Sequence, residues 1–399
     1  MDMEARRVIE ALRSGVPSRA VGQYFSDARP QIMKVISDSL DDTAQNGRSG
    51  GMLISGRYGE GKTHLLNAAF NMASDNNMVV SYLSLGKETP FDKLSTVYQK
   101  LIQNTYLPKR EQPGFLSLLE SMSANSPAAA DLMLFAGKEL QTDKLYYVLQ
   151  TYLNTEDQDE RFSLLSDMEG DFVAAADLKR AYKRIFGKSL KLSQNFSKTK
   201  HSWDYFAFMS RLFTKLGYRG WLILIDEAEL IGKLGKKARI RAYENMAGFL
   251  YPNNTLESCY TIFAMSSSYA EEVIDKKREF ENLELSQPDR QEPAKTVLNR
   301  ILSAPQLQPL TADEIAQIIN RIREFHGRAY DWNPDIDSAK LRDKVMGSGF
   351  LLRTRLRSAI EILDQLYQYG EAGDLKVGQL FEENLNDESV PDLGFLTEE

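Results

Sequence analysis

The chain has 399 residues, of which 42% are hydrophobic and 26% charged, and its formal net charge at pH 7 is −7. This balance is typical of a soluble globular protein and argues against a uniformly basic coat for nucleic acid. No apolar run reaches the ~20 residues of a membrane span, the first residues show no secretory cleavage site, and the single Cys259 excludes an internal disulfide. We therefore expect a cytoplasmic protein without a membrane anchor.

The chain begins with a predicted helical segment and a strand. Apolar residues recur at helical spacing through residues 4–46, which predicts two helices joined by a loop. A glycine-rich break follows, and then apolar runs at 52–55 and 78–85 that have the length of strands. Residues 1–50 are therefore assigned to an N-terminal helical segment.

The middle of the chain combines a long helical stretch with further strands. Residues 87–218 show almost only helical periodicity and are far longer than one crossover helix requires, which predicts a helical insertion. The continuously apolar runs 221–225 and 259–265 predict parallel strands that are covered on both faces. The run 307–310 predicts a short fifth strand. Together these segments define a core domain at 51–310.

The C-terminal part is predicted to be helical. Thr311 and Glu314 have the spacing of a capping box, which marks the start of a helix, and two further helical patterns follow it. We assign residues 311–370 to a helical lid and residues 371–399 to an acidic tail.

A glycine-rich loop carries the strongest chemical signal. Residues 56–63 match the phosphate-loop pattern G-x-x-x-x-G-K-[ST] in full, between a predicted strand and a predicted helix. Glycines let the backbone N–H groups curl towards phosphate oxygens, and the helix directs its positive end at the same oxygens. Lys62 is expected to reach the β- and γ-phosphates of ATP, and the Thr63 hydroxyl to bind Mg²⁺. A glycine turn with an incidental lysine is the alternative. The predicted nucleotide-binding residues of this segment are Gly56, Arg57, Tyr58, Gly59, Glu60, Gly61, Lys62, Thr63 and His64.

Two carboxylates end the apolar run at 221–225. Asp226 is expected to hold the magnesium ion, and Glu227 to orient and polarise the attacking water as the catalytic base. The ends of parallel strands are where open α/β sheets bind ligands. Many buried strands end in an acid, so this run predicts hydrolysis only in combination with the phosphate loop.

Three other side chains are candidates for a role in hydrolysis. Ser267 follows the run 259–265 and is placed to contact the γ-phosphate or the water, although a serine turn that caps the next helix is an equal alternative. Arg300 and Arg357 are candidates for stabilising charge on the transferred phosphoryl group. Arg353 lies four residues before Arg357 and shares its helix face. A surface arginine is otherwise a solvated charge.

These motifs together resemble the AAA+ architecture. The resemblance implies a P-loop α/β core with a five-stranded parallel sheet, a large helical insertion and a C-terminal helical lid. It also implies that Arg357, within the segment 356–363, is the sensor arginine of the lid. Initiator-type relatives carry a winged-helix DNA-binding domain after the lid. That domain is not found after residue 369, so DNA contact does not follow from this resemblance.

Three segments narrow the resemblance to one family. Residues 6–21 (RRVIEALRSGVPSRAV), 56–66 (GRYGEGKTHLL) and 79–102 resemble the ATP-binding family of bacteriophage-exclusion (BREX) systems, particularly its BrxD-like members. The resemblance is weak across the middle insertion. It implies a bacterial cytoplasmic ATPase that acts as an oligomer in anti-phage defence, beside a helicase-like, methyltransferase or nuclease partner. It also makes Val16 and Pro17 candidate contacts of the adenine base, with a turn that binds no ligand as the alternative.

Two basic segments are candidates for DNA contact. Residues 179–200 contain eight Lys or Arg and no acid, interleaved with Tyr182, Phe186 and Phe196, a composition typical of a surface that follows phosphates and stacks on bases. Residues 233–241 form a second cluster. A solvated helix face, or a contact with an acidic protein surface, is the alternative for both.

We compare four functional classes with the motifs. The first is an ATP-driven oligomeric motor or switch that acts on DNA or partner proteins. The second is a nucleotide-gated scaffold with slow turnover. A superfamily 2 helicase would need a second motor domain with a Q-x-x-G-R-x-x-R motif, and neither is found. A small-molecule kinase is the fourth. We predict the first class.

Overall fold

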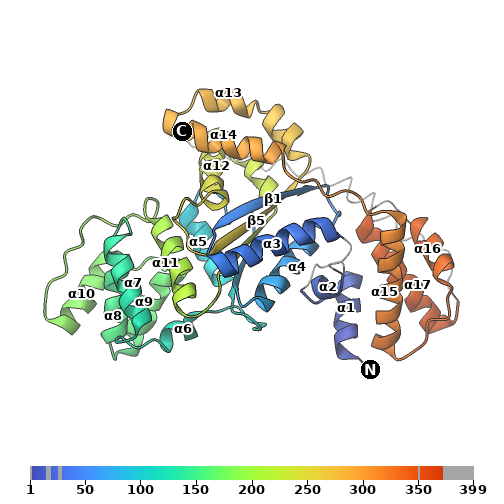
Figure 1. Ribbon diagram of the computed structural model, residues 1–399, viewed down its shortest axis with the longest axis horizontal. Helices are drawn as coiled ribbons and strands as arrows, with labels where there is room; N and C mark the ends of the chain where they lie inside the picture. The colour runs from blue at the N-terminus through green and yellow to red at the C-terminus, as the bar shows by residue number, and fades with distance from the viewer. Residues whose placement is uncertain (1, 15–18, 26–28, 349–350, 372–399) are drawn as a thin grey trace. The chain divides into compact units, whose positions relative to one another are not determined.

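The computed structural model describes residues 2–14, 19–25, 29–348 and 351–371. The chain divides into two compact units, which are described one at a time (Figure 1). One unit consists of residues 1–30, 57–68 and 307–399, and the other of residues 31–56 and 69–306. We call the first the terminal unit, because it contains both ends of the chain, and the second the sheet unit. Among the described residues, no helix is both long enough and apolar enough to cross a membrane.

The sheet unit is built on a five-stranded sheet with the strand order β1-β5-β4-β2-β3. The strands are β1 Gly50–Gly56, β2 Val79–Ser84, β3 Thr105–Tyr106, β4 Trp221–Asp226 and β5 Cys259–Ser266. The four strands β1, β5, β4 and β2 run parallel, and every residue of β4 is buried. Burial along the whole strand is expected where a parallel sheet is covered on both faces, so the predicted α/β class is confirmed.

The prediction of a wholly parallel sheet is wrong at the edge strand. β3 pairs antiparallel with β2, and it lies within the stretch 87–218 that was predicted to be helical. Two residues are too few to show the alternating pattern of a strand. β3 is fixed by contacts across the sheet instead: the hydroxyls of Ser81 and Thr105 are 2.6 Å apart, and the Trp221 indole donates to Ser81 at 2.8 Å.

The predicted strand at 307–310 is also absent from the sheet that the structure describes. In its place Gln306 makes a single parallel bridge with Ser55, whose N–H donates to the Pro305 carbonyl at 3.0 Å. Proline lacks the N–H that a ladder needs, and prolines at 305 and 309 bracket this segment. Pairing therefore stops after one bridge.

The helices of the sheet unit lie in three groups. Those nearest the strands in sequence are α3 Pro30–Asn46, α4 Lys62–Asp75 (whose first turns belong to the terminal unit) and α5 Leu94–Gln103. The insertion contains α6 Leu116–Glu120, α7 Pro127–Lys138, α8 Lys144–Asn154, α9 Gln158–Ser166, α10 Ala175–Phe186 and α11 Ser202–Lys215. After β4 come α12 Lys236–Leu250, α13 Glu279–Glu284 and α14 Pro288–Leu302. Short helical turns are η2 Asp167–Asp171, η3 Ala228–Lys233 and η4 Ala270–Asp275.

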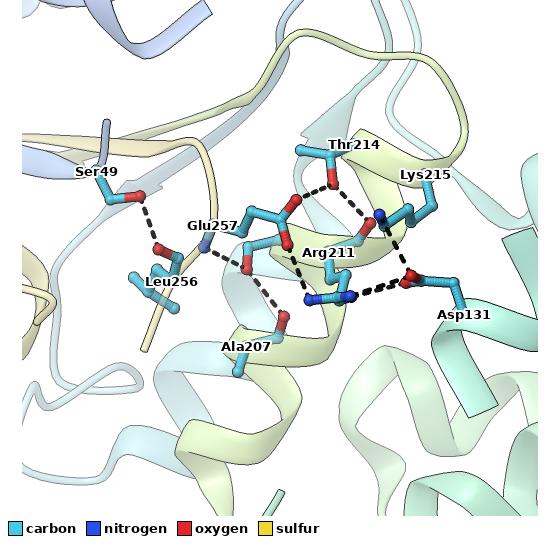
Figure 2. Close-up of polar contacts among 9 residues, drawn as sticks. Ser49, Asp131, Ala207, Arg211, Thr214, Lys215, Leu256 and Glu257 are labelled. Atoms are coloured by element: carbon cyan, nitrogen blue, oxygen red, sulfur yellow. Dashed lines mark hydrogen bonds and ion pairs between the residues drawn. The ribbon is translucent and has the colours of Figure 1, made fainter. Parts of the chain in front are cut away.

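The insertion is a helical bundle, and Arg211 is one of the residues that bond it to the segment before β5. α7, α9 and α10 pack around α8, and α11 packs on both α7 and α5 (Figure 1). Arg211 on α11 holds Asp131 of α7 through two hydrogen bonds of 2.7 and 3.1 Å, and contacts Glu257 at 3.3 Å (Figure 2). Glu257 precedes β5, so Arg211 connects the bundle with the start of a central strand.

We expect Arg211→Ala to lower the free energy of unfolding by about 1–3 kcal/mol, because it removes hydrogen bonds to charged groups. Arg211 lowers the pKa of the Asp131 carboxyl by donating to it. A lowered pKa means that this contribution is present in full above the ordinary aspartate pKa of 3.8 and is lost only as the pH falls through the lowered value. Urea unfolding should therefore give the same loss at pH 5.5 and pH 8. A loss that disappears at pH 5.5 would contradict the assignment.

The terminal unit packs the N-terminal helices and the C-terminal helices into one core. Its helices are α1 Met3–Ser14, α2 Arg19–Tyr24, α15 Ala312–Tyr330, α16 Ser338–Met346 and α17 Leu352–Tyr369. α1 packs against α15 and α17, and the buried side chains of all five helices form one apolar cluster. The predicted capping box is present at the start of α15. Residues 4–46 contain three helices rather than the two predicted, because α2 occupies part of the expected loop.

A chain of hydrogen bonds around the buried His326 links α1, α15 and α17. The Trp332 indole N–H donates to Nδ1 of His326 at 2.9 Å, so Nδ1 is an acceptor and the imidazole hydrogen lies on Nε2. Nε2 is 3.0 Å from Asp364 of α17, which also accepts two hydrogen bonds from Arg13 of α1, at 2.7 and 3.1 Å. The N-terminal helix is thus bonded to the C-terminal helices.

Candidate nucleotide site

The phosphate loop has the strand and helix that its sequence predicts. β1 ends at Gly56 and α4 begins at Lys62. Gly59 and Gly61 have φ angles of +77° and +91°, in the left-handed region where a Cβ is disfavoured, so the spacing of glycines in the motif matches the backbone it forms. The loop therefore ends at the positive end of a helix, a ready position for an anion.

Side chains of the loop bond to its own backbone. The Arg57 N–H donates to the Glu60 carboxylate at 2.7 Å. Lys62 is 8% exposed, and its ammonium donates to the Arg57 carbonyl at 3.2 Å and so lies across the loop. Tyr58 is 54% exposed and points out of the protein core. Thr63 follows Lys62 in the first turn of α4, and its carbonyl accepts from the Asn67 amide at 3.1 Å.

Residues near the N-terminus hold this loop in the terminal unit. Arg29 donates to the Glu60 carbonyl at 2.9 Å and to the Gln308 carbonyl at 2.7 Å. The His64 ring donates from Nε2 to the Phe25 carbonyl at 3.0 Å, and burial lowers the pKa of His64, so the ring is neutral at pH 7. Sequence reasoning assigned His64 to the nucleotide and missed Arg29, because a lone arginine far from the motif gives no pattern.

The C-terminal helical segment reaches the same loop. Leu351, which precedes α17, lies 3.8 Å from the position that a Cβ on Gly59 would take. Arg353 and Arg357 follow on the first two turns of α17, and Nε of Arg353 is buried without a hydrogen-bond partner among the described residues. The predicted adenine contacts Val16 and Pro17 lie outside the described residues.

The acidic pair lies at the carboxyl end of the sheet. Asp226 is the last residue of β4 and is 2% exposed. One of its carboxylate oxygens accepts from the Tyr82 hydroxyl of β2 at 2.9 Å, and the other accepts from the Glu227 N–H at 2.9 Å. Burial and the charge of Asp226 raise the pKa of Tyr82, so the phenol keeps its proton. Glu227 has a φ of +56° and directly precedes η3.

Tyr82 is a functional candidate that sequence reasoning missed. It lies 144 residues before Asp226 and becomes its neighbour only because β2 pairs with β4. The signal available in the sequence was a polar ring near the end of an otherwise apolar run. That signal cannot be interpreted without the strand order.

The serine-tipped strand lies between the two motif-bearing strands. β5 pairs with β1 on one side and β4 on the other, and Gly56 is opposite Ser266. The Ser267 N–H donates to the Gly56 carbonyl at 3.1 Å, and the Ser266 N–H donates to the Glu229 carboxylate at 3.1 Å. The structure thus places Ser267 against the start of the phosphate loop, and Glu229 is a third residue, after Arg29 and Tyr82, that the sequence did not indicate.

The remaining candidates lie on helices. Arg300 is in the last turn of α14 and is half-buried. In the segment 233–241, Arg239 is buried and paired with Glu279 at 2.6 Å, and Arg241 contacts Asp92 at 3.4 Å. Two of the five basic side chains of that segment therefore form ion pairs within the chain.

The donor groups of the two motifs have the chemistry that Mg²⁺ prefers. No group of three or more His, Cys, Asp or Glu side chains with metal-binding geometry occurs among the described residues. Mg²⁺ does not need such a cage, because it keeps several waters and is held by one or two protein oxygens together with nucleotide phosphates. The Asp226 carboxylate and the Thr63 hydroxyl supply oxygens of this kind.

The protein has a phosphate loop after β1 whose backbone requires glycine at two positions, and a buried strand, β4, that is followed by a pair of acids at 226 and 227. These features define a P-loop nucleotide-binding protein. Residues 2–126 and 138–376 match the family described as BREX system ATP-binding protein BrxC/D. The chain belongs to this family of ATP-binding proteins. The match extends over most of the insertion, which is more than the sequence resemblance suggested, and its gap coincides with α7.

The chain was also compared with solved structures and with curated proteins. A Walker-type ATPase of Pyrococcus abyssi resembles the chain with a TM-score of 0.37 and 13% sequence identity, over 88% of this chain and 70% of that chain. No curated protein matches the sequence significantly.

Proposed function

We propose that the protein is a Mg²⁺-dependent ATPase that acts as an AAA+-type motor or switch in bacterial anti-phage defence. The observation that carries the proposal is the phosphate loop, whose two left-handed glycines and buried lysine have the geometry that the motif requires, in a chain that belongs to an ATP-binding family. We test it by measuring phosphate release from ATP with Mg²⁺ and with excess EDTA.

In this proposal Lys62 binds the β- and γ-phosphates, and Thr63 and Asp226 hold the metal ion. The bound metal would neutralise charge on the phosphates. Glu227 follows the metal-binding carboxylate directly and would orient the attacking water and accept its proton. Its backbone N–H donates to Asp226, which fixes the backbone of Glu227 next to the Asp226 carboxylate.

The helical parts would respond to the nucleotide. Residues 311–370 would act as a lid, with Arg353 and Arg357 entering near the phosphate loop from α17. Ser267 would report the state of the γ-phosphate through its bond to Gly56. Arg300 would serve a neighbouring subunit in a homo-oligomer. We further propose that the ATPase works beside a helicase-like, methyltransferase or nuclease protein, and that DNA stimulates it.

Tyr82 should set the metal requirement of this reaction. Because its hydroxyl fixes one oxygen of Asp226, we expect Tyr82→Phe to raise the Mg²⁺ concentration for half-maximal ATP hydrolysis about 10-fold, while the rate at saturating Mg²⁺ changes little. Mn²⁺ binding measured by electron paramagnetic resonance with a non-hydrolysable ATP analogue should weaken in parallel.

Tyr260→Phe is the matched control for Tyr82→Phe. Tyr260 lies on β5 opposite Gly50, at the amino end of the parallel strands, away from Asp226. It should leave the metal requirement unchanged. An equal shift in both variants would assign the effect to a general loosening of the sheet.

A slow-turnover scaffold is the second candidate, because the family is described by ATP binding rather than by hydrolysis. Tight ATP binding by the wild type, with no Mg²⁺-dependent phosphate release, would favour the scaffold. DNA-stimulated release together with ATP-dependent assembly, measured by light scattering, would favour the motor.

A further inference from the structure

We propose that the helical insertion binds double-stranded DNA through its phosphates, on a lysine surface formed by α10 and the segment that follows it. This inference rests on the DNA-contact part of the proposed function and deepens it, because it selects one surface and one form of nucleic acid. The lysine surface is defined by six exposed side chains: Lys179, Lys183, Lys188, Lys191, Lys198 and Lys200.

Four of the six exposed residues of α10 are basic. The helix buries Leu178 and Ala181, while Lys179 and Lys183, four residues apart, share the exposed side. Figure 1 shows α10 at the end of the bundle farthest from the strands of the sheet unit. A long partner could therefore reach this face.

The six lysines differ from the two arginines of the same segment. Arg180 pairs with Asp177, and Arg184 pairs with Asp157 and Glu160, so both arginines are neutralised within the chain. For the six lysines the described part of the chain offers no ion-pair partner. Residues 179–200 contain no acid, so the positive charge of this surface is left to a partner outside the chain.

The segment after α10 is anchored, although it has no regular structure. Leu190 is buried, and the Ser193 N–H donates to Asp143 at 2.9 Å. Phe196 packs against the ammonium of Lys144, which lies 4.0 Å from the ring centroid and is itself fully buried in an ion pair with Asp167. The lysines therefore project from a segment whose backbone position is set before any partner binds.

The aromatic rings of the segment are half-buried and pack on one another or on neighbouring rings, which leaves only part of each ring open for stacking on bases. Tyr182 contacts Tyr147 and Phe186 at centroid distances of 5.4 and 4.6 Å. Phe196 packs on Tyr205 as well as on Lys144. Single-stranded nucleic acid is usually bound by stacking on open rings, whereas duplex DNA presents two phosphate rows and paired bases. The lysine surface therefore suits a duplex.

An acidic protein partner is less consistent with this surface. Protein interfaces are depleted in lysine and enriched in aromatic residues, methionine and arginine at their centres. No large hydrophobic side chain between residues 172 and 201 is exposed. Phosphate contacts alone carry no sequence information, so we expect binding without sequence preference.

The test compares two sets of lysine replacements in the full-length chain. The first variant carries Lys179→Gln, Lys183→Gln and Lys188→Gln; the second carries Lys236→Gln and Lys237→Gln, exposed lysines of the other basic segment. Binding of a labelled 30-base-pair DNA duplex and of a 30-nucleotide single strand is followed by fluorescence anisotropy between 50 and 200 mM salt. Thermal unfolding verifies that both variants are folded.

The wild type should prefer the duplex, with a slope of log affinity against log salt of up to about −5 if all six lysines contact phosphates. The first variant should lose about 0.9 of slope for each lysine replaced and bind at least 10-fold more weakly at 100 mM salt, while the second variant should bind like the wild type. Preference for the single strand, loss of binding in the second variant alone, or displacement of the protein by poly-glutamate but not by duplex would each overturn the proposal.

The duplex-binding result can be distinguished from the result for ATP hydrolysis. Basal phosphate release should be equal in both variants and the wild type, because none of these lysines belongs to the nucleotide site. Normal hydrolysis without duplex binding would overturn the lysine surface alone. Duplex binding without hydrolysis would overturn the ATPase alone.

Discussion

Lys62→Ala should abolish ATP binding, with an affinity at least 100-fold below that of the wild type. The Lys62 ammonium is buried at the start of α4 and is the charged group of the loop that phosphates would meet. Removing it leaves the backbone N–H groups and the helix end without the charge that offsets the triphosphate. Isothermal titration with a non-hydrolysable ATP analogue measures the loss.

Lys87→Ala is the control for this variant. Lys87 is an exposed lysine after β2, and its replacement should leave ATP affinity unchanged. An affinity of Lys62→Ala within threefold of the wild type would mean that the loop does not hold the phosphates. The family assignment would then have to be reconciled with a different nucleotide site.

Glu227→Gln should retain ATP but slow its hydrolysis by about 10²–10⁴-fold, the range expected for loss of a general base. Glutamine keeps the size of the side chain and cannot accept a proton. The left-handed backbone of Glu227 and its N–H bond to Asp226 are main-chain features, so the substitution should leave the geometry of the strand end intact.

Single-turnover phosphate release and ATP affinity are the two measurements needed for Glu227→Gln. Glu271→Gln, an exposed acid on η4, serves as the matched control and should hydrolyse ATP normally. Normal turnover by Glu227→Gln would remove Glu227 from the mechanism. Loss of ATP binding would show a structural role instead.

The parts of the site that are local in sequence were predictable. The phosphate loop is a contiguous motif whose glycines are required by its own φ angles, and the carboxylates at 226 and 227 follow a continuously apolar strand. Both signals depend on neighbours within eight residues. A pattern that depends only on such near neighbours can be recognised in a single sequence.

The parts that depend on long-range contact were not predictable. Tyr82 reaches Asp226 through strand pairing, and Arg29 reaches the phosphate loop from outside the motif. The edge strand β3 is too short to leave a periodic pattern, and prolines end the pairing at residue 306 after one bridge. The strand order brings Tyr82 to Asp226, and the prolines limit the pairing of residue 306.

Composition alone does not show which side chains of the basic segments are exposed. The residue types at 179–200 indicated both charge and stacking. In the structure the aromatic rings make packing contacts, whereas the lysine side chains are exposed. At 233–241 a buried ion pair takes Arg239 into the core beside Glu279. A charge or a ring counts for binding only where the fold leaves it exposed, and burial of individual side chains is not readable from composition.

The most direct test of the account is phosphate release from ATP by the purified full-length wild type, with Mg²⁺ and with excess EDTA, in parallel with Glu227→Gln. The account predicts release that requires Mg²⁺ in the wild type and is at least 100-fold slower in the variant, while both proteins bind ATP. Equal release with and without Mg²⁺, or from both proteins, would contradict the assignment of Asp226 and Glu227 as the catalytic end of β4.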